Sequence, residues 1–123
     1  VDEAIAMATM YTANHMSVKA IIALTESGST TRWMSRIRSD IPIYAFTPYV
    51  STSRRVAMYR GVYPVQFEID GENPRSLYRD IVDTLLANKL VEEGDFALLT
   101  KGELNGVSGS TNSMSVIKIT SSS

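Results

Sequence analysis

Five short apolar runs, separated by longer mixed segments, set the pattern of this chain. The run at residues 20–24 has no polar alternation, which is typical of a strand that is covered on both faces of a sheet. Proline cannot donate a ladder hydrogen bond, so the run that contains Pro64 should form an edge of the sheet. The runs predict strands at residues 20–24, 41–46, 62–67, 96–100 and 114–119.

The mixed segments have apolar residues at helical spacing and predict four helices. Asn73 and Pro74 supply an N-cap and a first-turn proline for the last helix, and Gly61 supplies a C′ residue for the third. The first helix is apolar around most of its surface, so we expect one side to pack on the sheet and the other to contact a second subunit or a further domain. The predicted helices cover residues 1–15, 31–38, 51–60 and 74–89.

The order α-β-α-β-α-β-α-β-β predicts an α/β fold with three layers, α/β/α, around a five-stranded, mostly parallel sheet. Right-handed crossovers place the strands in the order 3-2-1-4-5. No helix fits between the last two strands, so they should pair antiparallel. The length predicts a single domain over residues 1–123. The chain opens without an initiator methionine, and we interpret it as a domain excised from a longer chain.

Composition narrows the possible functions. Hydrophobic residues make up 44% and charged residues 20% of the chain, a globular balance. The net charge of −1 gives no reason to expect nucleic acid or an anionic membrane as a partner. The sequence has no cysteine and no apolar stretch near the ~20 residues of a membrane span. We therefore expect a cytoplasmic protein without disulfides or thiolate metal sites.

Hydroxyl side chains concentrate in residues 25–31, here named the hydroxyl loop, between the first strand and the second helix. Backbone N–H groups and the helix dipole at such a position attract anions, and hydroxyls add hydrogen bonds. The alternative is an ordinary helix N-cap, because Ser and Thr are common there as well. The predicted phosphate-binding residues are Thr25, Ser27, Gly28, Ser29 and Thr30.

A second loop rich in glycine and hydroxyls, residues 101–112, follows the fourth strand. Ligands of parallel sheets bind at the carboxyl ends of strands where the strand order reverses. That point lies between the first and fourth strands, so both loops should face one cleft and hold a phosphate-bearing ligand. The alternative is a polar hairpin loop. The residues expected to contact the ligand are Ser108, Gly109, Ser110 and Thr111.

Catalytic and metal sites are not apparent. The sequence contains neither a P-loop nor a GxGxxG motif. His15 is the only histidine, which leaves no Ser-His-Asp triad and no clear base for an enzyme with a Ser or Thr nucleophile. We predict no catalytic residue, no metal ligand and no cofactor, and a ligand that is held rather than transformed.

Three motifs of the sequence resemble the C-terminal domain of pyruvate kinase, most closely in the bacterial type II enzymes. Residues 24–30 are similar to the family's Thr-x-Ser-Gly-x-Ser effector loop, and Arg36 matches a frequent arginine on the next helix. Residues 59–65 read Tyr-Arg-Gly-Val-Tyr-Pro-Val, and residues 109–112 match a closing Gly-x-Thr-Asn. The motifs keep the family's order and spacing, and the resemblance covers nearly the whole chain.

The resemblance implies a parent enzyme that transfers a phosphoryl group from phosphoenolpyruvate to ADP with Mg²⁺ and K⁺. That chemistry belongs to a (β/α)₈ catalytic barrel that this chain lacks. The chain would be the allosteric and tetramer-forming domain of that enzyme and inactive alone. The first helix and terminal strand would contact another subunit. The alternative is a free-standing module that binds a phosphate ligand.

The resemblance also places an effector, a sugar phosphate or a nucleotide, between the two loops. Glu26 lies in the first loop, and the second carries Glu103 and no arginine. Because like charges repel at short range, a second phosphate is disfavoured there. We therefore expect a sugar monophosphate or a nucleotide monophosphate.

Overall fold

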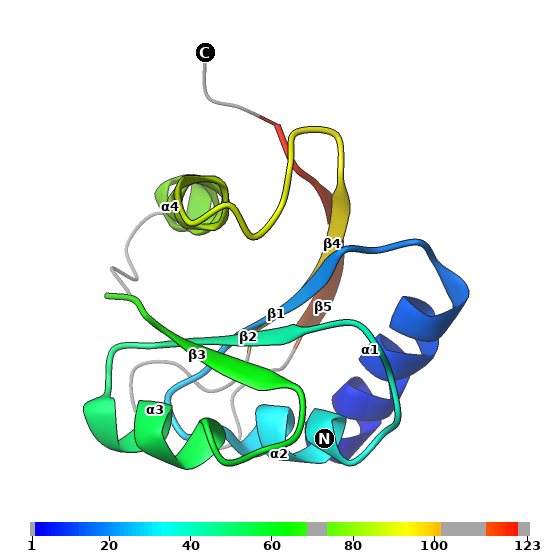
Figure 1. Cartoon of the computed structure of the whole chain (residues 1–123), viewed down its shortest axis with the longest axis vertical. Coiled ribbons are helices and arrows are strands. Elements are labelled where there is room, and N and C mark those ends of the chain that lie inside the picture. The colour runs from blue at the N-terminus through cyan, green and yellow to red at the C-terminus, as the bar shows by residue number, and fades with distance from the viewer. Residues whose placement is uncertain (1, 69–73, 102–112, 121–123) are drawn as a thin grey trace.

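The computed structural model describes residues 2–68, 74–101 and 113–120, and its five strands form one mixed sheet (Figure 1). The strand order is β3-β2-β1-β4-β5. All neighbours are parallel except β4 and β5, which are antiparallel. This topology confirms the predicted one. The strands are β1 (Ala20–Leu24), β2 (Ile43–Thr47), β3 (Val62–Gln66), β4 (Phe96–Lys101) and β5 (Ser113–Lys118).

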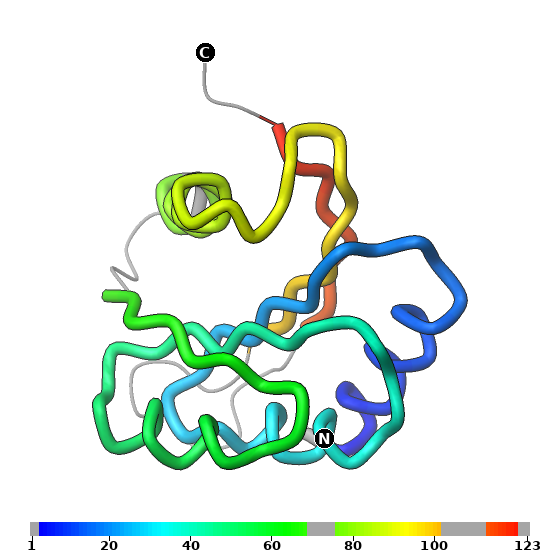
Figure 2. Tube along the Cα trace, in the orientation of Figure 1, coloured from blue at the N-terminus to red at the C-terminus, as the bar shows by residue number. Residues whose placement is uncertain are grey.

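Helices cover both faces of the sheet. They are α1 (Asp2–His15), α2 (Ser29–Ser35), α3 (Val50–Val56) and α4 (Pro74–Ala87). Helix α4 covers one face alone, whereas α1, α2 and α3 cover the other, and the tube in Figure 2 shows the chain crossing between the layers. Each face has its own buried cluster: Phe46 and Leu99 lie on the α4 side, and Met34 and Leu98 lie on the opposite side.

The edge position predicted for the strand around Pro64 is confirmed, since β3 lies at the end of the sheet. The Ile43 N–H donates to the Gly61 carbonyl, and the Phe67 N–H donates to the Thr47 carbonyl. Alternate residues of a parallel strand face the same neighbour, so the odd-numbered residues of β3 direct their backbone groups toward β2. The nitrogen of Pro64 therefore faces away from the sheet.

Two helices differ from their predicted bounds. Helix α2 begins two residues earlier, because Gly28 adopts a left-handed conformation (φ 84°) and acts as its N-cap without a side-chain hydrogen bond. Helix α3 ends four residues earlier than predicted. There the Tyr59 N–H donates to the Val56 carbonyl, and such i→i−3 bonds tighten the chain out of the α-helix. Helix α2 also ends three residues earlier than predicted, at Ser35. The other described boundaries agree within two residues, the usual scatter.

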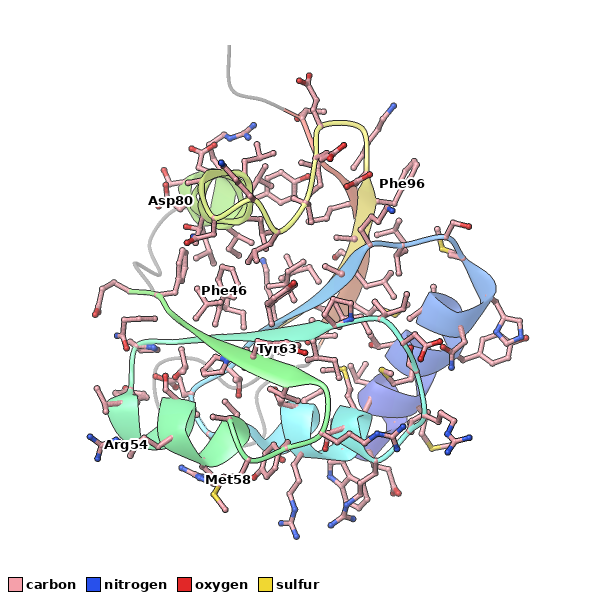
Figure 3. The ribbon with its side chains drawn as sticks, viewed as in Figure 1. Phe46, Arg54, Met58, Tyr63, Asp80 and Phe96 are labelled. Carbon is pink, nitrogen blue, oxygen red and sulfur yellow. The ribbon has the colours of Figure 1, made fainter. Side chains whose placement is uncertain are left out.

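Helix α1 is buried on one side only. Ala6, Met10 and Ala13 pack against the sheet, as predicted for one face of this helix. The other face is exposed in the single chain. Two apolar residues of β4 and β5, on the side of the sheet that α1 covers, are exposed as well. Val116 lies on that side because it pairs with Leu98, which belongs to the buried cluster there. We name these residues the α1–β5 surface: Met7 (59% exposed), Tyr11 (66%), Phe96 (42%) and Val116 (47%), with Phe96 labelled in Figure 3.

Candidate anion-binding site at the carboxyl ends of the strands

The hydroxyl loop leaves β1 at the carboxyl end of the sheet and bonds largely to itself. Thr25 is buried, and its Oγ1 accepts a hydrogen bond from the Gly28 N–H at 2.8 Å. The Ser27 Oγ accepts one from the Ser29 N–H at 3.2 Å. Two hydroxyls predicted to face a ligand thus hold the loop's own backbone, and an anion using these N–H groups would share or replace their bonds.

Helix α3, which follows β2, stabilises the same loop by hydrogen bonds. Thr52 donates from Oγ1 to the Glu26 carbonyl at 2.6 Å, and Arg55 donates from Nη1 to the Ser27 carbonyl at 3.0 Å. Our sequence interpretation missed this contribution. The strand order contains a signal for it, because β2 pairs with β1 and so the segments that follow these two strands emerge side by side.

The side chain of Glu26 also has a hydrogen-bond partner at the start of α3. The Tyr49 hydroxyl donates to the Glu26 carboxylate at 3.1 Å. Ionising the phenol would remove this bond and set two negative charges together, so the hydrogen bond first and the charge second raise the pKa of Tyr49. The contact is therefore present at neutral pH and is lost as the pH rises through that raised pKa.

The remaining residues of the loop lie where α2 begins. Gly28 is buried against α3, and a Cβ added to it would lie 2.8 Å from Val56 Cγ1. Ser29 and Thr30 are the first two residues of α2, and Thr30 is buried. The structure therefore brings all five predicted residues, Thr25 to Thr30 apart from Glu26, into one compact turn at the end of β1.

The second predicted loop lies outside the described residues, and with it Ser108, Gly109, Ser110 and Thr111. The strand that leads into this loop is described. Lys101, the last residue of β4, pairs with Leu24, the last residue of β1. The two loops consequently leave the sheet from adjacent positions at the same edge.

A groove of about 390 Å³ runs between α2 and α3 and begins at the hydroxyl loop. Neither loop contains an arginine, but arginines of the adjacent helices line this groove. We name it the arginine groove; it is lined by residues 27–29 of the loop, Arg32, Trp33 and Arg36 beside them, and Arg55 and Tyr59 across from them.

Two findings concern other kinds of site. Among residues 2–68, 74–101 and 113–120, no three His, Asp or Glu side chains lie close enough together to hold a metal ion. Within the same ranges, no helix has the length and apolar character needed to span a membrane.

Comparison with known proteins gives a consistent result. The sequence profile of the family described as "Pyruvate kinase, alpha/beta domain" matches residues 3–117. The chain is 38% identical over 120 residues to a pyruvate kinase of Buchnera aphidicola subsp. Baizongia pistaciae, and 38% identical over 120 residues to pyruvate kinase II of Salmonella typhimurium. Each alignment covers 97% of this chain and 25% of the relative.

A solved structure shares the fold as well. Cryptosporidium parvum pyruvate kinase in complex with ADP superposes with a TM-score of 0.82 and 28% sequence identity. The match covers 97% of this chain and 24% of that one. The chain thus spans about a quarter of the length of the relatives that it matches.

Proposed function

Because this chain belongs to the pyruvate kinase alpha/beta domain family, we propose that it is the allosteric effector-binding and subunit-interface domain of a pyruvate kinase. The observation that carries the proposal is the family match over residues 3–117, combined with coverage of only a quarter of each relative. The parent enzyme would be cytoplasmic and would convert phosphoenolpyruvate and ADP to pyruvate and ATP with Mg²⁺ and K⁺. Reading the natural gene tests this proposal: a catalytic barrel encoded upstream is expected, and a gene confined to this segment would favour a free-standing module instead.

The effector site of this proposal lies at the hydroxyl loop. Thr25, Ser27, Gly28, Ser29 and Thr30 would hold the phosphate of a sugar monophosphate or nucleotide monophosphate, and the second loop would close over it. The position of the hydroxyl loop in the fold supports this assignment. The loop stands at the carboxyl end of β1, next to the parallel β4, where open parallel sheets bind ligands. The bracing bonds from α3 to residues 26 and 27 also hold the loop in one arrangement before a ligand arrives.

Thr30→Ala is expected to weaken the binding of glucose 6-phosphate or ribose 5-phosphate about tenfold or more. A hydrogen bond to a charged group contributes roughly 1.5–3 kcal/mol, and 1.4 kcal/mol corresponds to a factor of ten. Calorimetric titration of both sugars against the wild type and the variant measures the change. Thr30→Ser is the matched control, since it keeps the hydroxyl and should keep the affinity.

Thr30→Ser also controls for an effect on folding, because Thr30 is buried and its replacement by Ala could destabilise α2. Thermal unfolding of both variants separates that effect from the loss of a ligand contact. Equal affinity of the wild type and Thr30→Ala would exclude the hydroxyl from the site. Tighter binding of fructose 1,6-bisphosphate than of either monophosphate would contradict the preference for a single phosphate.

The subunit contact of this proposal uses the α1–β5 surface. Its four apolar side chains come from one helix and two strands on the same side of the sheet. Exposed apolar side chains on one side of a domain mark interaction sites when they adjoin. A second copy of the chain would cover it.

Tyr11→Glu is expected to shift the chain toward monomer by placing a charge in that contact. Sedimentation equilibrium at concentrations on the order of 10 µM, in the range of weak interfaces, measures the change. Met58→Glu is the control, because Met58, like Tyr11, is a large exposed hydrophobic residue (85%), but it lies on the outer side of the segment after α3 (Figure 3). An entirely monomeric wild type, or equal association of Tyr11→Glu and wild type, would contradict the proposed interface.

A further inference from the structure

Charge is distributed unevenly between the two ends of this molecule. Residues 27–67 contain six arginines and one acidic residue, Asp40, whereas residues 80–95 contain five acidic residues and one basic residue, Lys89. Helices α2 and α3 lie at one end of the longest axis of the molecule, and the turn between α4 and β4 lies at the other end (Figure 1). The chain therefore has a positive and a negative end, although its net charge is only −1.

The positive end is concave. Arg32, Arg36 and Arg55 are exposed and line the arginine groove, and none of the residues that line it is acidic. In the described part of the chain, no carboxylate lies at salt-bridge distance from these three guanidinium groups. The guanidinium of Arg36 lies 4.9 Å from the centre of the Trp33 ring, a cation–π contact that restrains it. The groove thus presents positioned guanidinium groups to an incoming anionic group.

The negative end is a turn with a fixed backbone. We name residues 92–95 the acidic turn. The Glu92 N–H donates to the Asp95 carboxylate at 2.8 Å, and the Ile119 N–H donates to the Asp95 carbonyl at 2.8 Å. Glu92 and Glu93 are exposed. The acidic turn therefore carries two glutamate side chains at the end of the molecule on a backbone that hydrogen bonds hold in place.

We propose that the acidic turn of one copy of this chain docks in the arginine groove of a second copy. Guanidinium and carboxylate groups form paired, charge-assisted hydrogen bonds. The groove has a volume of about 390 Å³, the size of a small-molecule site, which suits the side chains of a turn. The partner is a second copy because the complementary charge lies on the same chain, at the opposite end.

This contact joins two different surfaces, so it is heterologous. A copy that inserts its acidic turn keeps its own groove open, and further copies can add in a row. The contact does not rest on the effector site or on the α1–β5 surface proposed above. Ionic strength separates it from the apolar surface, because the Debye length falls from about 30 Å at 0.01 M salt to about 10 Å at 0.1 M, which weakens a contact between exposed charges.

The test is sedimentation velocity of the full chain carrying Tyr11→Glu, which suppresses the apolar contact, at about 100 µM protein, in the range of weak interfaces. We expect species larger than the monomer at 0.01 M salt and about tenfold weaker association at 0.1 M. In this background the groove variant, Arg32→Gln with Arg36→Gln, should weaken the low-salt association about tenfold or more. The turn variant, Glu92→Gln with Glu93→Gln, should do the same.

Arg54→Gln with Arg60→Gln is the matched control for the groove variant. It removes the same charge from exposed arginines of the same end of the molecule, but neither residue lines the groove. Arg54 lies on the outer side of α3 (Figure 3). The control should associate at least severalfold more tightly than the groove variant, and equal losses in the two would overturn the proposal.

Mixing the groove variant with the turn variant tests the heterologous geometry. The groove variant keeps an acidic turn and the turn variant keeps a groove, so an equimolar mixture has one intact contact and should form pairs and nothing larger. A mixture that stays monomeric, or a background chain without a salt-dependent species, would also overturn the proposal. Failure of the α1–β5 interface appears separately, as association at 0.1 M salt that Tyr11→Glu does not reduce.

Discussion

Phe46→Ala is expected to lower the free energy of unfolding by about 3–5 kcal/mol, the usual range for a buried aromatic residue. The Phe46 side chain is fully buried in the cluster between the sheet and α4 (Figure 3), and its ring centre lies 5.2 Å from that of Phe67. Truncation removes this ring contact and leaves a cavity that the flanking strands can fill only in part. Urea-induced unfolding, followed by circular dichroism, measures the change.

Phe96→Ala is the control for this prediction. Phe96 is the same residue type, at the start of β4, but its side chain is 42% exposed. It therefore loses less apolar burial on truncation and leaves no closed cavity. A loss at Phe46 no larger than the loss at Phe96 would show that the α4 side of the sheet is not packed as described.

Gly28→Ala should destabilise the chain by two additive mechanisms. Its left-handed backbone (φ 84°) costs a residue with a Cβ about 1–2 kcal/mol, and the new methyl would lie 2.8 Å from Val56 Cγ1, which adds about 1–3 kcal/mol of overpacking. Because Gly28 forms the N-cap of α2, the hydroxyl loop must move to accept the substitution. Chemical denaturation measures the stability.

Gly61→Ala separates the two mechanisms. Gly61 also has a positive φ (72°), but no atom lies within 4 Å of a Cβ built on it, so only the backbone strain remains. The difference between the two glycine variants should thus equal the contact with Val56. A double-mutant cycle with Val56→Ala gives the same quantity independently, and a coupling near zero would contradict the close packing of the loop on α3.

Much of the fold was predictable because its signals are local. The apolar run at residues 20–24 needs no partner to indicate a doubly covered strand, and Pro64 by itself indicates an edge. The start of helix α2 was misplaced because it depends on Gly28, which has a left-handed backbone and leaves no room for a Cβ beside Val56, 28 positions along the chain. The residues next to Gly28 in the sequence do not indicate that Val56 lies beside it.

In the candidate site, too, the local features were predictable from the sequence and the contacts between distant residues were not. The position of the hydroxyl loop followed from the strand before it, so residues 25–30 could be singled out from sequence alone. The internal hydrogen bonds of Thr25 and Ser27 could not, because a hydroxyl suits a ligand and a backbone amide equally well. Arg55 was missed because it reaches the loop from another connection, through packing rather than proximity in sequence.

The two edge strands of the sheet, β3 and β5, differ in their ability to pair with a further strand. On β3 the outward-facing nitrogen in the middle of the strand belongs to Pro64 and carries no hydrogen, so an incoming strand would find no donor there. The described strand at the other edge, β5, contains no proline. If two copies paired through β5, the doubled sheet would end in a proline-bearing strand on both sides. Because each outer strand would lack a donor at Pro64, such pairing favours two chains over a growing polymer.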